Sequence, residues 1–227
     1  PDHDVVLINP VQEALEAGIP TVIVGSPLGI SPGGKLIFVV NDDEATGRLA
    51  AERAASFLKP GDTVAILGLN PNILSSITRA NAFEITLAKL VPGIRMEERR
   101  NTSVSEGAAE EVAESVVDSE PAPRVLFTLN VNETRSAYQA LADTHNEGRI
   151  VLIACDQDLD LLHHLRSGGI DSLVAQNTFL MGYSAVVNIH KMLLGEPVAQ
   201  RTIVPPILIT RENVDSPEVQ QALEMDW

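Results

Sequence analysis

Cysteine, aromatic residues and basic charge are scarce in this chain of 227 residues. Its one cysteine, Cys155, excludes an intramolecular disulfide. Nowhere does an uninterrupted apolar run approach the roughly 18 to 20 residues that a membrane-spanning helix needs. The 16 lysine and arginine residues face 31 aspartate and glutamate residues, which gives a net charge of −15. Because so acidic a surface repels phosphate backbones, we expect no nucleic acid to bind this chain.

The rest of the composition is that of an ordinary globular protein. Hydrophobic residues make up 44% of the chain and charged residues 21%, which excludes a disordered, collagen-like or disulfide-built protein. The length is enough for one large domain or two small ones. The first four residues contain neither a basic nor an apolar segment, so they are not a signal peptide, although a mature chain would have lost one. Cys155 lies in an apolar run and is expected to be a small buried thiol.

Apolar segments rich in β-branched residues alternate with amphipathic helical patterns along almost the whole chain. Several of the apolar segments are continuous, which is typical of strands covered by helices on both faces. The sequence therefore predicts an α/β fold built on doubly wound parallel sheets. We expect strands at residues 5–9, 21–24, 37–40, 63–67, 95–99, 125–128, 150–155, 173–175 and 203–209. We expect helices at residues 12–17, 43–58, 69–90, 105–118 and 178–194.

The first forty residues do not form a complete layer on their own. Residues 5–40 contain three strand candidates but only one short helix. Because such a half-sheet cannot cover its own core, we expect further elements of the fold upstream of Pro1. The shortness of the helix also indicates that residues are absent near Val11.

Several motifs with known chemistry are incomplete. Residues 29–35 imitate a phosphate loop, but Leu36 replaces the required serine or threonine, and a strand follows instead of a helix. Residues 156–160 begin like a calcium loop, yet Leu161 and Ser167 stand where glycine and glutamate are needed. Neither His163 nor His164 has a partner at metal-ligand spacing, and no Gly-x-Ser-x-Gly element is present. We therefore expect no metal, no cofactor and no enzymatic reaction.

Polar residues follow four of the expected strands at their carboxyl ends. They are residues 68–72, Asn130, Asp156 and Gln176, and Arg79 lies in the helix after the first of these strands. In an open parallel sheet, ligands bind outside the carboxyl ends of the strands. Amides, a carboxylate and a guanidinium supply the donors and acceptors that a hydroxyl-rich ligand needs. The alternative role for Asp156 is to cap the helix that starts near Asp158.

Five stretches of the chain resemble, in the same order, type 1 periplasmic sugar-binding proteins, the superfamily of ribose-binding proteins and the lac repressor. The strongest of these matches is the stretch at residues 170–177, which is followed by Met181-Gly182 and Gly195-Glu196-Pro197. The five stretches are residues 40–52, Arg79-x-x-x-Phe83, and residues 126–130, 153–156 and 170–177.

The resemblance implies an architecture of two doubly wound lobes joined by three hinge strands, with a solute held between the lobes. The N-lobe would comprise residues 1–40 and 177–204, and it would lack its first βα units. The C-lobe would comprise residues 41–176 and 205–227. The crossings between the lobes would lie near Asn41, Gln176 and Pro205.

The resemblance also places four residues at positions that bind sugar hydroxyls in this family: Arg79, Asn130, Asp156 and Gln176. Where ribose and galactose binders often have Asp-Arg, this chain has Gly25-Ser26. We add Ser26 from that loop and Asn70 from the turn after the strand at residues 63–67. The candidate ligand-binding residues are therefore Arg79, Asn130, Asp156, Gln176, Ser26 and Asn70.

The function that this resemblance implies is that of an extracytoplasmic, periplasmic solute-binding protein. As a monomer, it would capture a sugar, a polyol or a similar small polyhydroxylated solute by hinge closure and deliver it to a membrane ABC permease. Two alternatives share the fold: the effector-binding domain of a cytoplasmic lac-repressor-like regulator, and the sensor domain of a membrane receptor. The sequence upstream of Pro1 would distinguish them, because a signal peptide, a basic helix-turn-helix and membrane spans each indicate a different class.

Overall fold

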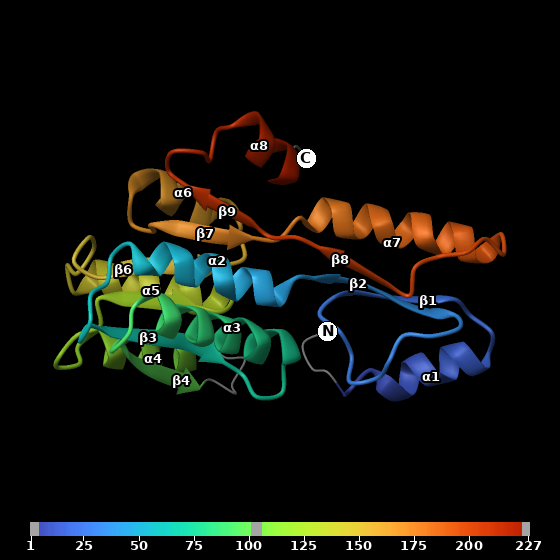
Figure 1. Ribbon diagram of the computed structural model, residues 1–227, viewed down its shortest axis with the longest axis horizontal. Helices are drawn as coiled ribbons and strands as arrows, with labels where there is room; N and C mark the ends of the chain where they lie inside the picture. Colours follow the sequence, from blue (N-terminus) through green and yellow to red (C-terminus); the bar gives the residue numbers. More distant parts are fainter. Residues whose placement is uncertain (1–4, 101–105, 224–227) are drawn as a thin grey trace.

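The computed structural model describes residues 5–100 and 106–223. They form two sheets that lie at opposite ends of the long axis of the molecule (Figure 1). All strand pairs are parallel except β7–β9, so the predicted α/β fold with parallel sheets is confirmed. The small sheet has the order β1 (Thr21–Gly25), β2 (Leu36–Asn41), β8 (Arg201–Val204). The large sheet has the order β4 (Arg95–Arg100), β3 (Thr63–Leu69), β5 (Val125–Thr128), β6 (Val151–Cys155), β7 (Ser172–Ala175), β9 (Ile207–Thr210).

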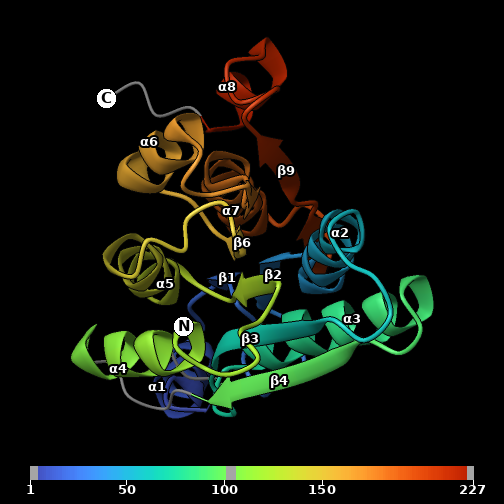
Figure 2. The same ribbon diagram turned by 90° about the vertical axis from the view of Figure 1, so that its left-hand side faces the viewer.

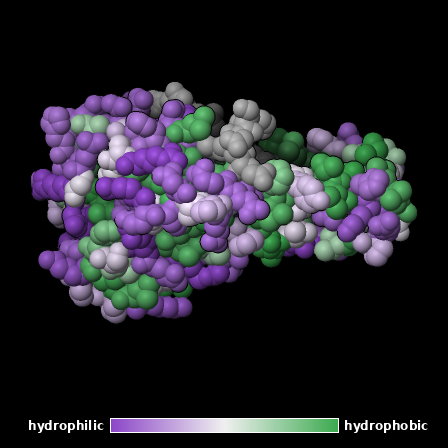
Figure 3. Space-filling view, turned by 90° about the horizontal axis from the view of Figure 1, so that it is seen from above, coloured by the Kyte–Doolittle hydropathy of each residue, from purple (hydrophilic) through white to green (hydrophobic). Residues whose placement is uncertain are grey.

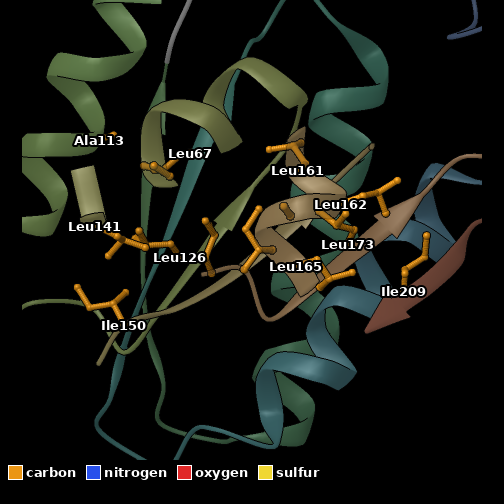
Figure 4. Close-up of a cluster of buried hydrophobic side chains, with 14 of the residues drawn as sticks. Leu67, Ala113, Leu126, Leu141, Ile150, Leu161, Leu162, Leu165, Leu173 and Ile209 are labelled. Carbon is orange, nitrogen blue, oxygen red and sulfur yellow. The ribbon is translucent and has the colours of Figure 1, made fainter. Parts of the chain in front are cut away.

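Helices lie on both faces of the large sheet (Figure 2). A hydrophobic core fills the space between the sheet and the helices on each face. The sheet's strands β3 and β5 are buried along their whole length, because successive side chains point alternately into the two cores. Helices α2 (Asp43–Ala55) and α3 (Leu74–Leu90) cover one face, where Phe83 stacks on Phe127. The other core is shown in Figure 4 and is covered by α4 (Glu106–Val117), α5 (Val131–Asp143), α6 (Leu159–Ser167) and α8 (Pro217–Leu223).

The small sheet is covered by α1 (Ile8–Glu16) and α7 (Thr178–Leu193). Met181 is the only buried residue of α7, although the helix is rich in apolar side chains. Tyr183, Val186 and Leu193 of α7 are each at least 60% exposed. Figure 3 shows hydrophobic residues gathered at this narrower end of the molecule. Within the described residues, no helix combines the length and apolarity that a membrane crossing requires.

Three connections join the two sheets. Strand β2 ends at Asn41, and α2 begins two residues later, with Asp42 as its N-cap. Strand β7 of the large sheet ends at Ala175, and α7 packs on the small sheet. Strands β8 and β9 are separated by two prolines, Pro205 and Pro206. The chain thus passes between the sheets at the three places where the resemblance predicts crossings.

Two of the strand predictions are wrong. Residues 5–9 form a turn and the start of α1, and the side chains of Val5 and Val6 are more than half exposed. A short apolar run cannot distinguish a strand from the start of a helix, and Pro10 fits the first turn, where its missing N–H is not needed. Residues 203–209 form two strands in different sheets, because Pro205-Pro206 has no N–H donors for a ladder.

The expected helices match α1, α2, α3, α4 and α7, with shifts at their ends. Helix α3 begins at Leu74 instead of Leu69, because Leu69 is the last residue of β3. Ser105, the expected start of α4, lies outside the described residues. Helices α5 and α8 were not predicted, and α6 was predicted only by its start near Asp158.

Candidate ligand-binding site

A cavity of about 170 Å³ lies at the carboxyl edge of the large sheet, next to the crossings from β2 and β7. Gly25 and Asn41 of the small sheet and Ser26, which directly follows β1, line one side. Residues at the carboxyl ends of the large-sheet strands and residues of α3 line the other side. Five of the six candidate residues predicted from the sequence meet in this cavity: Ser26, Arg79, Asn130, Asp156 and Gln176. The strand-end rule therefore brings together residues that are up to 150 positions apart.

Arg79 and Asp156 form the charged centre of the cavity. The Nη1 atom of Arg79, on α3, lies 3.1 Å from each carboxylate oxygen of Asp156 and donates to the Leu129 carbonyl oxygen at 3.0 Å. Asp156 directly follows β6 and has a φ of 68°, a left-handed conformation that aspartate and asparagine tolerate better than most residues. The turn after β6 thus directs the Asp156 carboxylate toward the guanidinium.

A second carboxylate holds the other edge of the guanidinium. Arg79 Nε donates to Asp43 Oδ1 at 2.8 Å, and both side chains are about 93% buried. Burial raises the pKa of Asp43, and the charge of Arg79 opposes that shift. Burial alone would lower the pKa of Arg79. The neighbouring charges, of which Asp156 contributes most, raise the pKa by more than burial lowers it, so Arg79 stays protonated. Sequence reasoning missed Asp43, because it was interpreted as the first residue of a helix, although it lies only two residues after the end of β2.

Gln176 completes a polar chain across the site. Its Nε2 donates to Asp156 Oδ1, and its backbone N–H donates to the Gln157 side chain at 3.0 Å. The Gln157 amide in turn donates to the Gln176 carbonyl oxygen at 2.8 Å. Gln157 therefore fixes the backbone at the crossing from β7 to α7.

The structure contradicts the capping role considered for Asp156. Asp158 is the N-cap of α6, and its Oδ1 accepts from the Leu161 N–H at 2.8 Å. Asp156 accepts hydrogen bonds from Arg79 and Gln176. Its carboxylate is therefore oriented by the site and not by the helix.

Asn130 combines a structural contact with a free donor. Its Oδ1 accepts from the Glu133 N–H at 3.0 Å as the N-cap of α5. Its Nδ2 has no hydrogen-bond partner among the described residues. A Cβ at Gly68 would lie 3.0 Å from this Nδ2 and 2.5 Å from Glu133 Cγ, so only glycine leaves room for the amide. One edge of the Asn130 amide is thus available to a ligand.

Residues from the small sheet reach the same cavity. The Ser26 hydroxyl lies 3.2 Å from the Ser75 hydroxyl of α3, so the two sheets are bridged directly at the cavity wall. Asn41 is 93% buried, and its Oδ1 has no hydrogen-bond partner among the described residues. Asn41 ends strand β2, so the strand-end rule could have found it, whereas Ser75 and Ser76 carry no sequence signal.

Asn70 is the candidate that the structure does not bring to the cavity. Its Oδ1 accepts from the Asn72 N–H at 2.9 Å within the turn after β3. Its backbone N–H donates to the Ser76 hydroxyl. Asn70 thus shapes the loop beside the cavity wall.

The chemical groups around the cavity are suited to hydrogen bonding. Within the described residues, no group of three or more metal-ligating side chains is close enough to hold an ion. The nearby Cys155 is buried, which raises the pKa of its thiol to about 12 and keeps it protonated. The arrangement can offer amide, hydroxyl, guanidinium and carboxylate groups to one small polar molecule.

Solved structures share this fold. A solute-binding protein of an ABC transporter from Agrobacterium vitis, bound with α-D-tagatopyranose, is 23% identical, with a TM-score of 0.87; the match covers 96% of this chain and 76% of that one. A carbohydrate transporter solute-binding protein from Agrobacterium radiobacter, in complex with D-arabinose, is 22% identical, with a TM-score of 0.85 and coverage of 97% and 75%.

A periplasmic component of an ABC-type sugar transport system from Hahella chejuensis is 27% identical, with a TM-score of 0.83 and coverage of 92% and 76%. No curated protein sequence matches the chain significantly. The family described as "Periplasmic binding protein domain" matches residues 1–197. Because this match spans most of the chain, the protein belongs to the periplasmic binding protein domain family.

Proposed function

We propose that this protein is an extracytoplasmic solute-binding protein that captures one small sugar or polyol in the cavity between its two sheets. The observation that carries the proposal is the cavity itself, because polar side chains from both sheets converge on one small volume. Ser26 and Asn41 come from the small sheet, and Arg79, Asp156 and Gln176 belong to the other side. A solute that bonds to both sides would be held more tightly when the sides are close together.

The size and the lining of the cavity support a solute of monosaccharide size. Its volume of about 170 Å³ is close to the roughly 150 Å³ of a protein cavity that accommodates one benzene ring. None of the described lining residues is aromatic, so binding would depend on hydrogen bonds more than on ring stacking. The related structures were solved with tagatose, fucose, arabinose and allose, which are polyhydroxylated solutes of this size.

We further propose that the two sheets are the cores of two lobes that rotate about Asn41, Gln176 and Pro205. Small backbone changes at a few connecting residues are sufficient for a hinge of this kind. Capture in the periplasm, delivery to a membrane ABC permease and the absence of any catalysed reaction follow from the same proposal. They agree with the description of the Hahella relative as a periplasmic component of a sugar transport system.

A thermal-shift panel of pentoses, hexoses, polyols, amino acids and nucleosides tests the proposed function. A solute present at 100 times its dissociation constant should add roughly 2.7 kcal/mol to the free energy of unfolding. We expect stabilisation by one or a few sugars or polyols. Stabilisation by amino acids alone, or by nucleosides alone, would contradict the sugar assignment.

A further inference from the structure

The cavity contains two opposite charges and one further charge immediately behind them. Among the described lining residues, only Arg79 and Asp156 are charged. Asp43 does not line the cavity, but its Oδ1 lies 2.8 Å from Arg79 Nε. One guanidinium therefore serves two carboxylates, and the three groups together carry a charge of −1.

This charge balance determines what Arg79 can offer to a solute. An arginine with a free edge is a strong binding group for carboxylates and phosphates. Arg79 is paired at Nε with Asp43 and at Nη1 with Asp156, so its positive charge is already compensated. An anionic solute would have to give up water and enter a site of net negative charge, whereas an uncharged solute meets no such repulsion.

We propose that Asp43 is a specificity-determining residue that, without touching the solute, makes the cavity reject anionic solutes such as sugar acids in favour of uncharged sugars and polyols. The inference rests on the proposed function, because it concerns solutes that occupy this cavity. Asp43 acts through Arg79 and is therefore a positioning residue.

The surroundings of Asp43 support a role beyond holding the helix. It is the first residue of α2, but the helix is already capped by Asp42, whose Oδ1 accepts from the Ala45 N–H at 2.8 Å. Burial disfavours the ionised form of Asp43 and raises its pKa. The cap of α2 therefore does not depend on Asp43, whose buried carboxyl group lies against Arg79 at the back of the cavity.

The substitution Asp43→Asn removes the negative charge of the side chain and keeps its size and shape. An asparagine side chain keeps an oxygen that can accept from Arg79 Nε, but it removes one negative charge. The matched control is Asp42→Asn, which makes the same change of charge one residue away and preserves the cap, because asparagine caps helices as well as aspartate does. Asp42 makes no ion pair with Arg79.

The experiment compares paired probes by thermal shift and calorimetry. The neutral arm contains D-galactose, D-glucose, D-arabinose, D-ribose and xylitol, and the anionic arm contains D-galacturonate, D-glucuronate, D-arabinonate, D-ribonate and D-xylonate. In the unmodified protein, we expect binding in the neutral arm, with every acid weaker than its neutral counterpart. In Asp43→Asn, the ratio of the dissociation constants of the acid and the neutral partner should fall on the order of tenfold. In Asp42→Asn, the ratio should stay within about twofold of the original.

The outcomes separate this inference from the proposed function. An acid that binds the unmodified protein as tightly as its neutral partner would overturn the inference and leave sugar binding intact. An unchanged ratio in a folded Asp43→Asn variant would remove Asp43 as the determinant. If neither arm binds, the proposed function fails and the inference fails with it. The comparison in the unmodified protein tests the exclusion of acids even if Asp43→Asn does not fold.

Discussion

Arg79 Nη1 lies within 3.1 Å of both carboxylate oxygens of Asp156, which is 77 residues further along the chain. The contact joins helix α3 to the end of strand β6, and Gln176 extends it to the crossing between the sheets. Asp43 holds the other edge of the guanidinium, so the polar chain begins beside one crossing and ends beside another. The charged centre of the cavity is thus connected to two of the three places where the sheets are joined.

The first prediction concerns the Asp156 carboxylate. Asp156→Asn should leave the fold intact, because asparagine tolerates the left-handed backbone at this position. The affinity for the best sugar of the panel should fall by about 1.5 to 3 kcal/mol, the range for a hydrogen bond to a charged group. Calorimetric titration measures this loss. The control is Asp158→Asn at the cap of α6, which should keep both the affinity and the stability. Equal affinities for all three proteins would exclude Asp156 from binding.

The second prediction concerns the stability of the Arg79 network. Arg79→Met leaves the buried Asp43 without a partner and should lower the free energy of unfolding by about 3 to 5 kcal/mol. Arg166→Met removes an exposed ion pair with Asp215 and should cost only about 1 kcal/mol. Urea unfolding of both variants checks the difference. Adding Asp43→Asn to Arg79→Met should recover part of the loss, and the absence of any recovery would argue against an unpaired charge as its cause.

The third prediction concerns two helical glycines. A Cβ at Gly47 of α2 would lie 2.3 Å from the Arg79 carbonyl oxygen, so Gly47→Ala should destabilise the protein by about 1 to 3 kcal/mol through overpacking of α2 on α3. At Gly182 of α7, an added Cβ meets nothing within 4 Å. Gly182→Ala should therefore stabilise by about 0.5 to 1 kcal/mol, since alanine is the better helix former. Melting curves of the two variants should move in opposite directions, and a shift of the same sign would contradict the close approach of α2 and α3.

The fourth prediction concerns alkaline pH. Burial raises the pKa of the Cys155 thiol from its ordinary value of 9.0 to about 12. Between these values, the folded state retains a proton that the unfolded state releases, so stability falls as the pH rises. The contribution of Cys155 is complete below pH 9 and declines by about 1.4 kcal/mol per pH unit up to about pH 12.

The variant Cys155→Ala serves as the control for this loss of stability, because it lacks the thiol and retains every other group that titrates in the alkaline range. Urea unfolding at pH 8, 9 and 10 should show a shallower loss of stability for the variant than for the unmodified protein. Identical slopes would show that the thiol is accessible to solvent and not buried as the structure has it.

The sequence predicted the strands β3, β5, β6 and β7 of the large sheet well because they are buried on both faces. The continuous apolar run at residues 125–128 was predicted as a strand covered on both faces, and it forms β5 between two layers of helices. The run at residues 5–9 is equally apolar, but no neighbouring strand pairs with it among the described residues, and it enters α1. Helix α5 was missed because its buried face is made partly of polar and small residues, including Thr134, Ser136 and Ala137.

The part of the candidate site that was predictable from the sequence is the part that the order of the strands determines. Asn130, Asp156 and Gln176 follow parallel strands, whose carboxyl ends necessarily meet at one edge. The partner of Arg79 at Nε was not predictable, because the Asp43 contact depends on how closely α2 packs on α3. That close approach requires Gly47, and no spacing rule indicates which neighbour a helical glycine admits. Asn70 failed to reach the cavity because its side chain is used by its own turn.

We propose that a sugar binds between the two sheets and draws them together. Solution X-ray scattering tests it directly, with the protein measured alone and in the presence of the sugar that gives the largest thermal shift. We expect the radius of gyration to fall at a saturating concentration of that sugar, and to remain unchanged with a sugar that gives no shift. An unchanged radius at saturation with the binding sugar would contradict closure about Asn41, Gln176 and Pro205.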